Sequence, residues 1–363
     1  MRNSIHKRWQ ILFFLLVIVS FFSLNLTKEA SAAKSNSVRL KLVTYLSPAY
    51  GDIFYNIQRM ADYIGYYGGK HNLKAKVYHS QTVYKAKEML QACISGSIDI
   101  AILMGPSMEG SIPVFGGSGL PFIWGDIYTQ REGSRRGSPF FNLVSEECEK
   151  KNLVLLAMPS TEPEEFISRK PLRTIEDFRG IKIRTTGAMH AFALKAIGAV
   201  PVSMSSSEIY TSLQRGVIEA SMGLGSTFIA RKLFEIAKYQ TNINCFLFDW
   251  VAIMNKDRYL SLSKEQKNVI LNAAELYRHD HSVTELVGGY MHVRDILIKE
   301  HGVEEIYLPE SELTKFREAM SPVKGWWKKR VGVDFGNKVI KAIEDSHNWR
   351  KSRYGKLDFV HLK

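Results

Sequence analysis

The sequence predicts an α/β fold of two lobes, in which each lobe is a mixed sheet flanked by helices. Segments with strand and helix patterns alternate along residues 38–160 and again along 161–250, which is typical of sheets covered on both faces. Residues 98–104 are almost wholly apolar, as in a buried parallel strand. A helical pattern over residues 263–301 would be about 55 Å long if continuous, which exceeds one small domain. It predicts either two helices broken at Gly288-Gly289 or a single helix that spans both lobes.

The first block begins with a segment of alternating apolar and polar residues, the pattern of a strand covered on one face. The predicted strands are residues 38–45, 74–79, 98–104 and 153–158, and the predicted helices are residues 52–67, 85–94 and 139–150. Residues 105–121 form a connection rich in Gly and Pro.

The second block is punctuated by helix caps. Thr174 to Asp177 can cap a short helix that Gly180 ends, and Ser205 to Glu208 is a capping box that opens a helix ending at Gly216. The other predicted elements are strands at residues 181–185, 218–222 and 246–254 and helices at residues 188–197, 228–237, 310–320 and 335–345.

The first 32 residues have the composition of an export signal. Basic residues at positions 2, 7 and 8 precede an apolar run at 11–24, and Ala30-Ser31-Ala32 is a cleavage pattern. The run is shorter than the roughly 20 residues that span a bilayer. We expect cleavage after Ala32 and a soluble mature chain in the periplasm.

Composition excludes several classes of protein. With 45% hydrophobic and 23% charged residues, the chain is neither disordered nor a multi-span membrane protein. The net charge of +13 is scattered and lacks the aromatic and basic stripe of a nucleic-acid groove, so no nucleic-acid partner is expected. The chain has three cysteines, Cys93, Cys148 and Cys245, so at least one thiol stays unpaired, and no zinc motif is present.

Motifs for catalysis are scarce. The chain has no HExxH, GxSxG or Walker sequence, and the SxxK match at residues 261–264 lacks its partner motifs. His279 and His281 are two positions apart on a helix, so they do not face each other as metal ligands would. The sequence therefore predicts no enzyme, no cofactor and no metal site.

Arg184 is placed where an α/β sheet binds ligands. It lies near the carboxyl end of the predicted strand 181–185, just before a helix. Ligands of open α/β sheets bind at such strand ends, and a guanidinium can hold a carboxylate through two hydrogen bonds. The alternative is a structural arginine, and position alone does not decide between them.

Several segments give the chain a family resemblance. They are residues 95–99 (SGSID), 120–122 (LPF), 171–187 (PLRTIEDFRGIKIRTTG), 198–202 (GAVPV) and 207–216 (SEIYTSLQRG). With the export signal, they resemble the DctP-type substrate-binding proteins of tripartite ATP-independent periplasmic (TRAP) transporters. The most specific part is residues 180–216, and the likeness extends over nearly all of the mature chain.

The resemblance implies a periplasmic binding protein fold whose ligand cleft lies between two lobes. It assigns residues 33–160 and about 251–290 to lobe I, and residues 161–250 and about 291–363 to lobe II. It also implies that Arg184, the arginine of the family's G-x-K-x-R segment, grips the ligand carboxylate.

Departures from the family pattern concern the rest of the cleft. A Glu-Asn pair of the family is replaced by Met222 and Gly223, a polar position falls on Met104, and a variable arginine falls near Glu162. These changes suggest a monocarboxylate with a sizeable apolar or partly cationic body.

Three further residues are candidates to line the cleft. Asp249 and Trp250 lie on the predicted strand 246–254, and Tyr45 lies at the end of the first strand. Ordinary packing between the lobes is the alternative role for Asp249 and Trp250.

The resemblance also implies the partners. We expect a small organic carboxylate as ligand, the membrane permease subunits of a TRAP transporter as receptor, and a monomeric protein. A binding protein for another transporter or a sensor remains an alternative, as does a secreted enzyme.

Overall fold

Two mixed sheets form the frame of the molecule in this computed structural model, which describes residues 37–284 and 290–354. The first sheet has the strand order β2-β1-β3-β10-β4. Its strands are β1 (Val38–Thr44), β2 (Leu73–Tyr78), β3 (Ile100–Met104), β4 (Leu153–Ala157) and β10 (Trp250–Asn255). β1 is parallel to β2 and β3, whereas β10 is antiparallel to β3 and β4.

The second sheet has the order β11-β9-β5-β8-β6-β7. Its strands are β5 (Glu164–Ser168), β6 (Lys182–Thr185), β7 (Val200–Ser203), β8 (Ala220–Gly223), β9 (Tyr239–Phe246) and β11 (Glu304–Tyr307). β6 is parallel to β7 and β8, and β5 is antiparallel to β8 and β9. The predicted fold of two lobes, each a mixed sheet flanked by helices, is confirmed.

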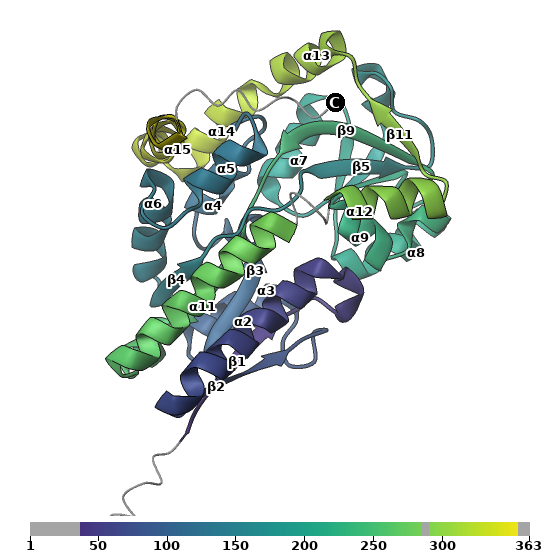
Figure 1. Cartoon of the computed structure of the whole chain (residues 1–363). Helices are drawn as coiled ribbons and strands as arrows, with labels where there is room; N and C mark the ends of the chain where they lie inside the picture. Colours follow the sequence, from purple (N-terminus) through teal and green to yellow (C-terminus); the bar gives the residue numbers. More distant parts are fainter. Residues whose placement is uncertain (1–36, 285–289, 355–363) are drawn as a thin grey trace, which may run out of the picture.

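Helices cover both sheets (Figure 1). The first lobe carries α2 (Asp52–Gly68), α3 (Ala86–Ile94), α4 (Val114–Ser118), α5 (Ile127–Gly133), α6 (Pro139–Glu149), α10 (Lys256–Leu260) and α11 (Lys264–Val283). Around the second sheet lie α7 (Ala188–Ala196), α8 (Ile209–Gln214), α9 (Gly225–Ala230), α12 (Tyr290–Asp295) with the π-helical turn η8 (Ile296–Glu300), and α13 (Glu310–Met320). The last helices are α14 (Pro322–Val331) and α15 (Val333–Tyr354), and short 3-10 turns include η1 (Pro48–Tyr50), η3 (Gly105–Met108), η4 (Ile175–Phe178), η5 (Ser206–Glu208) and η6 (Leu233–Glu235).

The long helix is described on both sides of residues 285–289. α11 packs on α2 and β4 of the first lobe, and α12 packs on α9 of the second. The predicted break at Gly288-Gly289 lies outside the described residues. A continuous helix that spans both lobes therefore stays a prediction.

The C-terminal helices contact both lobes. α15 packs on α4, α5 and α6, and α14 packs on α7 (Figure 1). The predicted residue boundaries of the two lobes, including the assignment of residues 291–363 to lobe II, stay predictions. The predicted signal at residues 1–32 lies outside the described part of the chain.

The glycine-rich segment after β3 is explained by packing. It was predicted as a loop, but it contains η3 and α4. A Cβ on Gly117 would lie 2.4 Å from Val339 Cγ1 and 2.8 Å from Trp327 Cη2. Only a glycine lets α4 approach α14 and α15 this closely, so the segment serves packing in the core.

Several sequence predictions of secondary structure are wrong. Strands β5, β7, β9 and β11 were not predicted, and the strand expected at 246–254 is divided between β9 and β10. The helix expected at 228–237 is α9 followed by η6. Among the helices of the described residues, none is long and apolar enough to cross a membrane.

Candidate ligand cleft

Arg184 lies in the second sheet at the carboxyl end of β6, between β7 and β8. It is only 5% exposed. Its Nε donates to the Met204 carbonyl and its Nη1 to the Met222 carbonyl, each at 3.2 Å. Among the described residues, no carboxylate forms an ion pair with this guanidinium. Burial lowers the pKa of Arg184, but a guanidinium remains protonated in proteins.

Two tyrosines of the first lobe lie close to this arginine. Tyr45 follows β1, and burial raises its pKa well above the usual value, whereas the charge of Arg184 opposes that shift. Tyr50, in η1, places its hydroxyl 3.4 Å from the Ser206 hydroxyl of the second lobe. The strand ends of the two sheets are therefore apposed around Arg184.

A buried acid and a buried imidazole lie beside Arg184. Glu164 Oε2 is 3.3 Å from His190 Nε2, and both side chains are 1% exposed. Burial raises the pKa of Glu164 to about 7 against the opposing charge of Arg184. Burial and the same arginine lower the pKa of His190 to about 3. At neutral pH the imidazole is therefore uncharged, and Glu164 is only partly ionised.

Trp250 and Met104 form the neighbouring wall. Trp250 begins β10 and pairs with Met104 at the end of β3. Its ring centroid lies 6.0 Å from that of Tyr45, and its buried Nε1 has no hydrogen-bond partner among the described residues. Of the predicted residues, Arg184, Tyr45, Trp250, Met104 and Met222 are thus brought together, Met222 through its carbonyl.

Gly223 lies next to Met222, at the end of β8. It is paired with Glu165 of β5. A Cβ there would lie at an ordinary contact distance of 3.4 Å from Phe228, so packing alone does not require a glycine. Its role as a ligand residue stays a prediction.

Asp249 faces a helix of the first lobe. Its Oδ1 accepts from the Ser134 hydroxyl at 2.6 Å and from Gln130 Nε2 at 3.2 Å, at α5. Burial raises the pKa of Asp249 to about 8, although both hydrogen bonds oppose the shift. These contacts join Asp249 to α5 and not to Arg184, and its ligand role stays a prediction.

Glu162 is engaged at the start of α9. Its Oε1 accepts from the Ser226 backbone N–H at 3.0 Å, and the side chain is 3% exposed. A carboxylate is favourable at a helix N-terminus because the first N–H groups lack partners there. The geometry gives Glu162 a capping role; the predicted ligand role stays a prediction.

Sequence reasoning missed four residues around Arg184: Tyr50, Glu164, His190 and Arg231. The only signal was the acidic run Glu162-Pro163-Glu164-Glu165, which reads as a surface loop. Buried acids in a strand break the apolar pattern by which strands are recognised. The other three come from separate turns and helices, which only folding brings together.

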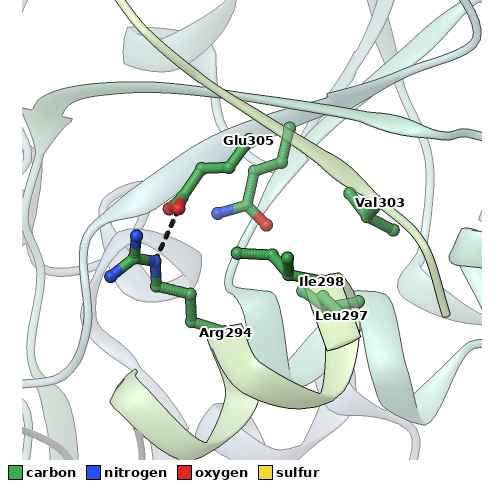
Figure 2. Close-up of a pocket in the computed structure, with 6 residues that line it drawn as sticks. Arg294, Leu297, Ile298, Val303 and Glu305 are labelled. Atoms are coloured by element: carbon green, nitrogen blue, oxygen red, sulfur yellow. Dashed lines mark hydrogen bonds and ion pairs between the residues drawn. The ribbon is translucent and has the colours of Figure 1, made fainter. Parts of the chain in front are cut away.

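Two surface hollows lie elsewhere. One, of about 150 Å³, is lined by Gln240, Arg294, Leu297, Ile298, Val303 and Glu305, with Arg294 paired to Glu305 (Figure 2). The other, of about 250 Å³, is lined by Glu109, Met189, Trp326, Trp327, Arg330 and Val331. Neither includes Arg184, and we attach no function to them. In the described parts of the chain, no group of three His, Cys, Asp or Glu residues could hold a metal ion.

Residues 68–329 match the model of a protein family described as bacterial extracellular solute-binding protein, family 7. The chain belongs to this family. The sialic acid-binding periplasmic protein SiaP of Vibrio cholerae is 26% identical over 322 residues, covering 86% of this chain and 96% of SiaP. The C4-dicarboxylate-binding periplasmic protein DctP of Rhodobacter capsulatus is 26% identical over 269 residues, covering 71% and 78%.

Solved structures of family members share the fold. DctP7, a Bordetella pertussis extracytoplasmic solute receptor solved with pyroglutamic acid, has a TM-score of 0.78 at 19% identity, covering 85% of this chain and 99% of that one. A TRAP periplasmic solute-binding protein from Haemophilus influenzae, solved with L-gulonate, has the same TM-score and coverage at 21% identity. The family match and the relatives together confirm the resemblance to DctP-type proteins of TRAP transporters, and the relatives are named as binding proteins and solute receptors.

Proposed function

We propose that this protein captures a small organic carboxylate between its two sheets, with Arg184 as the anchor, and delivers it to the membrane subunits of a TRAP transporter. One observation carries the proposal. Arg184 is a buried cation at the strand ends where the sheets meet, held by two carbonyl groups and by no carboxylate of the described chain.

The energetics favour an anionic ligand. A buried charge without a counter-ion is costly, because the interior solvates it poorly. A ligand carboxylate can neutralise the guanidinium and accept two hydrogen bonds in a fixed plane. Arg184 would therefore both attract the ligand and set its orientation. Tyr45, Trp250, Met104 and the Met222 backbone would surround the rest of the molecule.

The relatives support this class of ligand. Sialic acid, C4-dicarboxylates, pyroglutamic acid and L-gulonate, the ligands in the names and structure descriptions of the relatives, are all carboxylates at neutral pH. For this chain we propose a ligand of the same class and name no single compound.

Contacts between the lobes support a mechanism of closure. Tyr50 meets Ser206 on one side of Arg184. On another side, Glu109, which follows η3, accepts from the Ala188 backbone N–H at the start of α7 at 2.9 Å. A ligand that contacts both lobes stabilises this closed state over an open one, since only the closed state offers all of its contacts.

We further propose that the chain is exported, cleaved after Ala32 and monomeric. Mass spectrometry of protein isolated from the periplasm would give the cleavage site. Light scattering with the purified protein would give its oligomeric state.

The proposal is tested by a thermal-shift screen of carboxylic acids, each matched to its primary amide. A carboxylate ligand should raise the melting temperature, and by more the tighter it binds, whereas its amide should have no effect. Ligand recovered unchanged after incubation, by NMR, would separate a receptor from a secreted enzyme. An amide that binds as tightly as its acid would refute the carboxylate anchor.

A further inference from the structure

A second arginine lies beside the proposed cleft. Arg231 follows the last residue of α9 and is half-buried. Its Nη2 donates to the Ser206 hydroxyl at 3.2 Å, and its guanidinium carbon lies 5.6 Å from the centre of the Tyr50 ring. Its Nε is buried without a hydrogen-bond partner among the described residues. Arg231 therefore lies where both lobes meet.

The charge of Arg231 reaches the same groups as that of Arg184. The two guanidinium groups repel each other, which contributes to the lowered pKa of Arg184, and both stabilise the ionised form of Tyr45. Within residues 37–284 and 290–354, neither arginine forms an ion pair with a carboxylate. The nearest acid, Glu164, lies 3.3 Å from the uncharged His190 and is only partly ionised at neutral pH.

Two positive charges are thus opposed by at most one negative charge. One ligand carboxylate on Arg184 would leave Arg231 without an acceptor for its buried Nε. We propose, building on the function above, that Arg231 is a second anchor, so that the ligand carries another oxygen acceptor besides its carboxylate. The class comprises 2-hydroxy acids, 2-oxo acids and dicarboxylic acids.

This inference changes the ligand expected from the sequence. In the sequence, Glu162 in place of a variable arginine suggested a monocarboxylate with an apolar or cationic body. The Glu162 carboxylate is bonded at the start of α9, and a cation reaches the cleft from the far end of the same helix. The second positive group is supplied by a different position in the chain.

A purely structural role makes a different prediction. If Arg231 only holds the lobes together through Tyr50 and Ser206, its loss should weaken every ligand by the same factor. If it binds ligand, the loss should be confined to ligands with a second acceptor. Matched pairs of probes distinguish the two roles: succinate with butanoate, malate with succinate, and lactate with propanoate.

The experiment is isothermal titration calorimetry of these pairs with the wild type, Arg231→Gln and Ser206→Ala. In the wild type, at least one probe should bind more tightly than the partner that lacks the extra acceptor. Arg231→Gln should reduce that ratio at least tenfold, whereas Ser206→Ala, which removes the hydroxyl that contacts both Tyr50 and Arg231 but keeps the Arg231 charge, should preserve it. Circular dichroism checks that both variants fold.

Two results would overturn the inference. One is a wild type with no preference for the second acceptor in any pair, and the other is an Arg231→Gln variant that weakens both members equally. Arg184→Gln serves as the separate test of the carboxylate anchor. If it binds with wild-type affinity, the proposed function fails; if its affinity falls while the Arg231→Gln ratio is unchanged, only the second anchor fails.

Discussion

Arg184 in the cleft and Arg278 on α11 are the same residue type, each 5% exposed, in opposite electrostatic settings. Arg278 donates from Nε and Nη2 to both oxygens of Glu275, three residues earlier on the same helix, at 2.6 to 3.1 Å. Arg184 donates to two backbone carbonyls. The difference teaches that burial alone does not mark a binding residue; the source of the counter-ion does.

The contrast arises from secondary structure. On a helix, residues three apart are neighbours, so Glu275 can neutralise Arg278 within one turn. At the end of a parallel strand, the neighbouring groups are carbonyls of adjacent strands, which carry no net charge. A buried arginine at a strand end therefore needs an anion from elsewhere in the fold or from outside it.

The largest expected effect is on ligand affinity. Arg184→Gln removes the charged partner of the carboxylate, which costs about 2–5 kcal/mol, or about 30-fold to about 4,000-fold in Kd. Arg278→Gln should bind like the wild type, because its partner is internal. Calorimetry with the best ligand of the screen measures both. Equal losses of ligand affinity in the two variants would contradict the distinction drawn between the two arginines.

The next effect is on stability without ligand, and its sign should differ between the two arginines. Arg278→Gln loses hydrogen bonds to a carboxylate that is partly exposed, so we expect a decrease of about 1 kcal/mol in the free energy of unfolding. Arg184→Gln removes an uncompensated buried charge, so its free energy of unfolding should be unchanged or higher. Urea denaturation of both variants gives the values. A marked decrease for Arg184→Gln would show that its charge is balanced within the protein.

The third prediction concerns the pH dependence of ligand affinity, which Glu164 should cause because it lies beside Arg184. The groups that face it are Arg184, His190 and Tyr45. An anion bound at Arg184 favours the protonated form of Glu164, so carboxylate affinity should fall as the pH rises through about 7. The fall should be up to about tenfold between pH 6 and 8, which corresponds to a pKa change of about one unit. Glu164→Gln should bind with an affinity independent of pH in this range. If the affinity of this variant varies with pH as in the wild type, Glu164 is not the group that titrates.

Asp249 provides the smallest test, outside the arginine cleft. Its folded pKa of about 8 exceeds the unfolded value of 3.8, so its contribution to stability is complete below pH 3.8 and is lost as the pH rises through about 8. Between pH 7 and 8.5, Asp249→Asn should lose about 1 kcal/mol less stability than the wild type, because its amide does not titrate. His190 and His281, with pKa values near 3, do not titrate in this window. Thermal denaturation of both proteins across this pH range measures the effect. If the stability of the wild type and of the variant changed equally with pH, Asp249 would be ionised throughout.

Much of the fold could be predicted because local patterns agree with it. The alternation of β1, the apolar run of β3 and the capping box at Ser205 all occur where the sequence places them. β5 and β9 were missed because they bury polar side chains, including Glu164, Glu165 and Thr241, which interrupt the apolar pattern. These buried groups find partners on other strands, as Glu165 does with the Ile243 backbone N–H at 2.7 Å.

The sequence by itself determined the α/β class, the family and the place of Arg184 at a strand end, because each depends on residues close together in the chain. Only the tertiary structure decided that Tyr50, Glu164 and Arg231 surround that arginine, that Glu162 caps α9 and that Cys93, Cys148 and Cys245 are unpaired and buried. These facts depend on two sheets closing on each other, and such contacts between distant segments leave no periodic pattern in a single sequence.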